Sequence, residues 1–126
     1  MISVGIDMVE ISRIKKSMTN PRFFKVVFSE EENEALQEKL TAQSVAARFC
    51  AKEAFSKALG TGFRKFGFKD VQVFKDTLGK PYIVLSEKVK PLLDKSNYEI
   101  SLSLSHTKNY ACAVVVIEKS LINKEE

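Results

Sequence analysis

The stretch from residue 41 to residue 60 limits the possible folds of this 126-residue chain more than any other segment. Alanine, the strongest helix former, recurs in it at positions 46, 47, 51, 54 and 58. The pattern predicts a helix that starts at Thr41, continues through Lys57 and stops at Gly60, because glycine suits the left-handed conformation that ends many helices. Its small side chains would let a neighbouring backbone or a ligand approach this helix closely.

The residues before this helix are predicted to form one strand and two further helices. Residues 2–6 alternate between apolar and polar or small side chains, which is typical of a half-buried strand. Helical spacing of apolar residues predicts a short helix directly afterwards, over 7–18. Ser29 and Glu32 have the spacing of a capping box, so a second helix is expected from there to about residue 40.

The second half of the chain is predicted to be mainly β-structure. Residues 71–75 and 82–85 flank a connection suited to a hairpin, and the strongest alternation lies at 100–105. An apolar strand over 110–118 follows a turn. A short helix over 89–94 is also expected, although proline at position 91 fits only near its first turn. Helices gathered before strands indicate the α+β class.

The length and charge of the chain narrow the class of partner. One domain spanning 1–126 is expected, because the chain has no room for a second core of ordinary size. The net charge of +4 favours an anionic partner. Nucleic acid, a phosphate-rich cofactor and an acidic protein all satisfy that charge.

Cysteine usage and hydropathy predict a cytoplasmic protein. Cys50 and Cys112 are far apart and lie in apolar stretches, which predicts two buried thiols in a reducing compartment. The sequence opens without a basic leader segment, and no apolar run reaches the ~18 residues of a membrane span.

Three charged residues each have a structural and a functional interpretation. Glu53 and Lys57 lie one helical turn apart, and their spacing alone favours an exposed ion pair worth ~0.3–0.5 kcal/mol. Asp7 lies where a strand is predicted to become a helix, and with Glu10 it favours a capping box. The functional interpretation requires Asp7 and Glu53 to converge in space. Two carboxylates beside a polyphosphate would hold Mg²⁺, which takes its remaining oxygens from water and substrate.

Other candidate features are weaker. The glycines of 60–62 could let a ligand approach the backbone, but a helix end and a turn explain them equally well. His106 ends a predicted strand, where an ordinary surface histidine is the commoner case. A basic run from Arg13 to Lys25, interrupted by apolar side chains, is either a solvated face or a docking surface for an acidic partner.

In combination, these segments resemble the holo-acyl-carrier-protein synthases, a small-subunit group of phosphopantetheinyl transferases. The resemblance is carried by GID at 5–7, RFCAKEAFSKA at 48–58, GTG at 60–62, GKPY at 79–82 and SHTKNYA at 105–111. It covers nearly the whole chain. The lysine-glutamate-alanine block with its following lysine, together with the late serine-histidine-threonine, is highly specific for that family.

The resemblance implies a reaction and a set of partners. The reaction is the Mg²⁺-dependent transfer of 4′-phosphopantetheine from coenzyme A to a serine of an acidic apo acyl carrier protein, which releases 3′,5′-ADP. The family fold has helices packed on a mainly antiparallel sheet, and it forms homotrimers with sites at subunit interfaces. No nucleic-acid or membrane partner is expected.

The resemblance also assigns residues. It implies that Asp7 and Glu53 bind the magnesium ion against the coenzyme A pyrophosphate and that Lys57 lies beside the same phosphates. The other implied cofactor-binding residues are Arg48, Lys52, Ser56, Gly60, Thr61, Gly62, Lys80, Pro81 and His106. Arg13, Arg22 and Lys25 fall where the family presents its basic surface to the carrier protein.

Two departures and two rival interpretations remain. Cys50 stands where the family usually has alanine, and the segment 86–98 is long for the family. A basic RNA-binding module fits the charge, but no strand interleaves aromatic with basic residues as such modules do. A non-catalytic coenzyme A binder is the other rival, and the intact Asp7, Glu53 and Lys57 argue against it. The group that takes the serine proton stays open between a water, Glu53 acting through a water, and His106.

Overall fold

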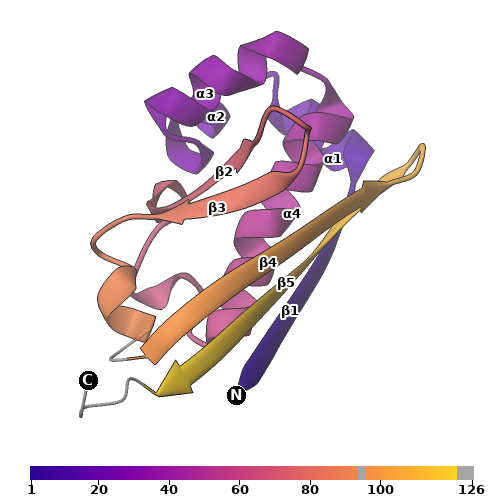
Figure 1. The fold of residues 1–126 in the computed structure, drawn as a ribbon. Coiled ribbons are helices and arrows are strands. Elements are labelled where there is room, and N and C mark those ends of the chain that lie inside the picture. The colour runs from indigo at the N-terminus through magenta and orange to yellow at the C-terminus, as the bar shows by residue number, and fades with distance from the viewer. Residues whose placement is uncertain (94–95, 122–126) are drawn as a thin grey trace.

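The computed structural model describes residues 1–93 and 96–121. Figure 1 shows a long helix packed on one face of a three-stranded sheet, with a two-stranded hairpin beside the helix and short helices gathered at one end. The helices are α1 (Ile11–Ser17), α2 (Pro21–Val27), α3 (Glu30–Leu36) and α4 (Ala42–Leu59). The strands are β1 (Ile2–Glu10), β2 (Val71–Lys75), β3 (Pro81–Leu85), β4 (Ser96–His106) and β5 (Tyr110–Leu121). The α+β prediction, with helices on an antiparallel sheet, is confirmed.

The larger sheet has the order β1–β5–β4, and both of its pairs are antiparallel. Its inner face packs on α4 and carries Val9 from β1 and alternate β5 residues from Ala111 to Ile117. The smaller sheet is the predicted hairpin, in which β2 and β3 pair from Val71 with Leu85 to Lys75 with Pro81.

The outer face of the larger sheet differs from the prediction. The alternation at residues 2–6 predicted a half-buried strand, and a strand is present. However, Ile2, Val4, Ile6 and Met8 point away from α4 and are between 59% and 66% exposed. Three of the four inner positions of β1, Ser3, Gly5 and Asp7, instead carry small or polar residues, because the α4 backbone lies too close to β1 there for large apolar side chains.

Gly5 makes this close approach possible. A Cβ atom at Gly5 would overlap the carbonyl oxygen of Ala54 and lie 2.6 Å from the backbone nitrogen of Ala58. The alanines of α4 that face the sheet are themselves buried. Small residues on both elements therefore set the distance between β1 and α4.

The boundaries of α4 agree with the prediction. The Thr41 side chain accepts a hydrogen bond from the Ser44 backbone nitrogen at 3.1 Å, which caps the helix. Gly60 ends it with a φ of 89°, in the left-handed region. Among the residues described, no helix is both long enough and apolar enough to cross a bilayer.

Three other helix predictions need correction. Strand β1 runs through Asp7 to Glu10, because its pairing with β5 continues without a break, so the predicted helix over 7–18 starts only at Ile11. The predicted Asp7–Glu10 capping box does not form, and Glu10 precedes α1 without a side-chain cap. The helix expected over 89–94 is a 3₁₀ turn at Lys90–Leu93, and position 94 lies outside the described residues.

The capping box at Ser29 forms as predicted, with both of its reciprocal hydrogen bonds to Glu32. The α-helix that it starts is shorter than expected, since it passes into a 3₁₀ turn at Gln37–Lys39. Helix α2 was not predicted. It begins at Pro21, and the Asn20 side chain caps it by accepting from the Arg22 nitrogen at 3.0 Å.

Candidate active site

The structure brings together Asp7 on β1 and Lys57 on α4, which are 50 residues apart in the sequence. Asp7 lies two residues beyond Gly5 on β1, so its side chain points to the same face as the close contact with α4. Lys57, on the last turn of α4, donates hydrogen bonds to Asp7 Oδ1 at 3.0 Å and to the Ile6 carbonyl oxygen at 3.1 Å. The exposed ion pair expected between Glu53 and Lys57 is therefore replaced by a pair between Lys57 and Asp7.

Glu53 lies one turn before Lys57 and shares their electrostatic environment. Burial raises the pKa of the Glu53 carboxyl, the negative charge of Asp7 raises it further, and Lys57 opposes both effects. Burial, followed by the charge of Asp7, also raises the pKa of the Cys50 thiol to about 12. Because Glu53 lies one helical turn before Lys57, and Lys57 contacts Asp7 directly, both carboxylates lie in the region where β1 meets α4.

This pair of carboxylates fits a magnesium ion by its donor chemistry. Carboxylate oxygens are the ligands that Mg²⁺ prefers, and the ion is commonly held by one or two of them plus waters and substrate phosphates. No cluster of three or more metal-ligating side chains occurs within residues 1–93 and 96–121. Asp7 and Glu53 would therefore leave most coordination positions to water and to a phosphate ligand.

Four more of the predicted cofactor-binding residues, Ser56 and Gly60 to Gly62, lie at the end of α4 near Lys57. Gly60 and Gly62 both have positive φ values, of 89° and 61°, and the Thr61 hydroxyl donates to the Gly62 carbonyl oxygen at 2.8 Å. The Ser56 hydroxyl is buried and donates to the Glu53 carbonyl oxygen at 2.6 Å, so it stabilises the last turns of α4.

Lys52 is not brought to this group. Its side chain is fully buried, and its ammonium donates to Glu32 Oε1 at 2.7 Å, to the Phe68 carbonyl oxygen at 2.9 Å and to the Val71 carbonyl oxygen at 2.7 Å. Burial lowers the pKa of Lys52, and the Glu32 carboxylate opposes that shift. All three of its hydrogens bind inside the protein, so Lys52 joins α4 to α3 and β2 and has none left for a cofactor.

Glu32 itself was not predicted as more than a helix cap. Its Oε1 accepts from the Ser29 nitrogen at 3.0 Å and its Oε2 accepts from the Val73 nitrogen at 2.9 Å. The capping pattern revealed its local role, but no signal in the sequence indicated that the same carboxylate would neutralise Lys52.

Arg48 and His106 line a hollow of about 460 Å³ that does not include Asp7, Glu53 or Lys57. Arg48 is buried, its Nη1 donates to the Val73 carbonyl oxygen at 3.4 Å, and its Nε has no hydrogen-bond partner among the residues that the structure describes. Burial lowers the pKa of Arg48, against the opposing charge of Glu32. Lys39 and Lys75 complete a basic lining, which suits an anionic group.

Lys80 and Pro81 lie next to that hollow. They line a neighbouring one of about 340 Å³, and the two hollows share Lys75 and Leu104. The predicted cofactor residues therefore fall into two groups in one chain. Arg48 and Glu53 lie about 140° apart around α4, so the two groups face different directions.

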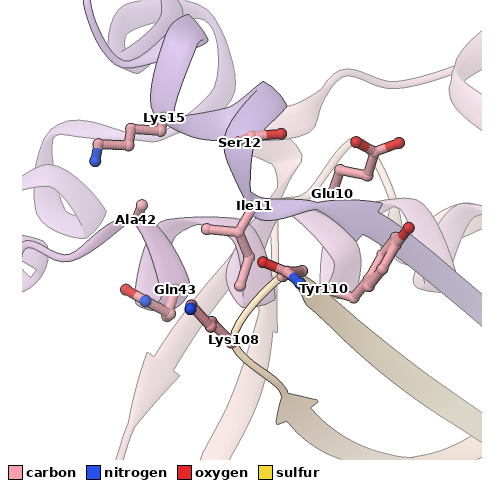
Figure 2. Close-up of a pocket in the computed structure, with 9 residues that line it drawn as sticks. Glu10, Ile11, Ser12, Lys15, Ala42, Gln43, Lys108 and Tyr110 are labelled. Atoms are coloured by element: carbon pink, nitrogen blue, oxygen red, sulfur yellow. The ribbon is translucent and has the colours of Figure 1, made fainter.

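Figure 2 shows a further hollow, of about 690 Å³, where the beginnings of α1 and α4 meet the turn between β4 and β5. Lys15 and Lys108 supply cations on its two sides, and Gln43 also lines the hollow beside Arg48. None of the predicted cofactor residues lines it. The hollow is formed by a tertiary contact, in which the Ile11 backbone nitrogen donates a hydrogen bond to the Asn109 carbonyl oxygen at 2.8 Å. Sequence spacing does not reveal this contact.

The three residues predicted for docking are exposed on α1 and α2. Arg13 lies on α1, and Arg22 and Lys25 lie three positions apart on α2. Arg22 borders a shallow hollow of about 280 Å³ that includes Phe23 and Val26. Basic and apolar side chains thus occur together on this surface.

Comparison with known proteins gives one family. Residues 3–115 match the model of the 4′-phosphopantetheinyl transferase superfamily. A holo-[acyl-carrier-protein] synthase of Clostridium botulinum is 45% identical over 117 residues, which are 91% of this chain and 95% of the relative.

Solved structures agree with that match. The Helicobacter pylori holo-[acyl-carrier-protein] synthase in complex with coenzyme A has a TM-score of 0.79 and 34% identity, over 91% of this chain and 99% of that one. The Neisseria meningitidis synthase has a TM-score of 0.85 and 32% identity, over 94% of this chain and 100% of that one.

Proposed function

This chain belongs to the 4′-phosphopantetheinyl transferase superfamily, and on that premise we propose that Asp7, Glu53 and Lys57 form its active site. The chain acts as a holo-[acyl-carrier-protein] synthase: it transfers 4′-phosphopantetheine from coenzyme A to a serine of apo acyl carrier protein and releases 3′,5′-ADP. The observation that supports the site is the convergence of two acids and a lysine where β1 meets α4.

Each member of the group has a role in phosphoryl transfer, in which positioning and charge stabilisation dominate. Asp7 and Glu53 would hold a magnesium ion, which would supply positive charge to neutralise the diphosphate of coenzyme A. Lys57 stabilises the negative charge that develops on the leaving phosphate. Glu53, whose pKa is raised by burial, is suited to accept the serine proton through a water.

The residues that line the two neighbouring hollows, Arg48 and His106 with Lys80 and Pro81, bind another part of the same coenzyme A molecule. For each site, these residues come from a neighbouring subunit. The outer face of the β1–β5–β4 sheet exposes a row of apolar side chains from Ile2 to Met8, and such patches mark interaction surfaces. We infer a homotrimer formed through this face, with sites shared between subunits, in which Arg48 and His106 of one chain act together with Asp7 of the next. The single-domain architecture over 1–126 and a cytoplasmic location belong to the same proposal.

The carrier protein docks on α1 and α2. Arg13, Arg22 and Lys25 attract its acidic surface, and the half-buried Phe23 with the exposed Val26 offers apolar anchors beside them.

The function is tested by mixing the protein with coenzyme A, Mg²⁺ and an apo carrier protein and measuring the carrier mass. The carrier should gain the phosphopantetheine arm. Glu53→Gln should slow this gain at least roughly 100-fold without changing the circular dichroism spectrum, because a neutral amide holds the metal and accepts a proton poorly.

The matched control is Glu34→Gln, which changes an exposed glutamate on α3 and should keep full activity. Absence of any mass gain with the unaltered protein would refute the transferase function. Near-normal turnover of Glu53→Gln would remove Glu53 from the active site while leaving the function intact.

A further inference from the structure

Lys57 lies beside the proposed metal ligand Asp7 as well as near the proposed position of the coenzyme A phosphates. Its ammonium lies 3.0 Å from Asp7 Oδ1, one of the oxygens assigned above to magnesium. The Lys57 side chain is 54% exposed, whereas Asp7 is only 18% exposed. The lysine side chain therefore has room to move toward solvent, whereas the Asp7 side chain is largely enclosed on the face of β1 that packs on α4.

A divalent cation on Asp7 would meet the Lys57 ammonium at short range. Like charges a few ångströms apart repel, and the repulsion is strongest where the site is partly shielded from water. The second acceptor of Lys57 is the neutral Ile6 carbonyl, which does not compensate for a repelling ion. A diphosphate arriving at the site would offer the ammonium a new anionic partner.

We propose that Lys57 competes with the magnesium ion for Asp7, and that coenzyme A relieves this competition by drawing the Lys57 ammonium onto its diphosphate. Metal and cofactor then bind cooperatively, each raising the affinity for the other by the same factor. This inference rests on the proposed function, because it assumes that Asp7 is a metal ligand.

The test measures Mn²⁺ binding by electron paramagnetic resonance, with and without coenzyme A, in the unaltered protein and in Lys57→Met. Without coenzyme A, Lys57→Met should bind Mn²⁺ roughly three- to tenfold more tightly, since a half-exposed ion pair with a carboxylate is removed. Coenzyme A should then strengthen Mn²⁺ binding by a smaller factor in Lys57→Met than in the unaltered protein.

Lys88→Met is the matched control, because it removes one positive charge from an exposed lysine elsewhere on the chain. Its Mn²⁺ affinity should equal that of the unaltered protein. Equal affinity in Lys57→Met and Lys88→Met, or an unchanged effect of coenzyme A in Lys57→Met, would overturn the inference.

Asp7→Asn separates this inference from the proposed function. It should weaken Mn²⁺ binding in the presence of coenzyme A. If it does not, Asp7 is not a metal ligand and the proposed active site fails. If it does, while Lys57→Met binds no more tightly than the control, only the competition is refuted.

Discussion

At the scale of single residues, Gly5 determines whether the proposed active site can form. Its missing side chain lets β1 touch the α4 backbone, and Asp7 follows two positions later on the same face. The distance of 3.0 Å between Asp7 and Lys57 is therefore a consequence of a glycine that takes no part in the chemistry.

Replacing Gly5 with alanine should destabilise the fold by roughly 1–3 kcal/mol or more, because the new methyl group meets rigid backbone atoms of Ala54 and Ala58. Chemical denaturation measures this change. Gly67→Ala is the control, since a Cβ there would lie 3.8 Å from its nearest neighbour, and it should cost far less. Equal stability of the two variants would show that β1 can shift away from α4.

The residues of the site could be predicted only in part. The family resemblance implied roles for Asp7, Glu53 and Lys57, whereas their local spacing favoured a helix cap and a surface ion pair. Both local interpretations were wrong, because the antiparallel pairing of β1 with β5 extends past Asp7. The motif also included Lys52, whose buried partners come from segments that sequence spacing does not connect.

At the scale of elements, the helix termini show where local sequence is sufficient. Ser29 and Thr41 cap α3 and α4 through side-chain hydrogen bonds within the next three residues. Both starts were predicted, since the required partners are adjacent in the chain. The buried face of β1 was not, because it depends on α4, which is distant in sequence.

A comparison of two helix starts tests this distinction. Ser29→Ala should lower the free energy of unfolding by about 1 kcal/mol, because it removes the side-chain cap of α3. Glu10→Ala should have little effect, since Glu10 precedes α1 without a side-chain cap hydrogen bond. Thermal unfolding of both variants provides the measurement, and a larger loss for Glu10→Ala would contradict the assignment of caps.

At the scale of the whole molecule, two features point to assembly. The apolar outer face of the sheet is exposed in a single chain, and the predicted cofactor residues lie in two groups that face different directions. The resemblance predicted a trimer, whereas the composition alone did not require one. The alternation at residues 2–6 identified a strand but not which partner would cover its apolar side.

Shared sites predict complementation between inactive variants. Asp7→Ala and His106→Ala should each be nearly inactive alone. Co-expressed in equal amounts, they should form mixed trimers, and over all trimers about a quarter of the sites should combine an intact Asp7 with an intact His106 from the neighbour. The carrier mass assay measures the recovered activity. No recovery, with both variants folded and mixed trimers present, would place each site within one chain.

The buried ammonium of Lys52 affects how a loss of activity in a variant should be interpreted. Lys52 and Glu53 are neighbours in one signature, yet Lys52 is held in a buried network of hydrogen bonds, whereas Glu53 is proposed to act in the reaction. On that proposal, a substitution at either position should abolish activity: at Lys52 because the fold is destabilised, and at Glu53 because the reaction is blocked. Thermal unfolding of each inactive variant is therefore needed to tell whether the substitution destabilises the fold or blocks the reaction.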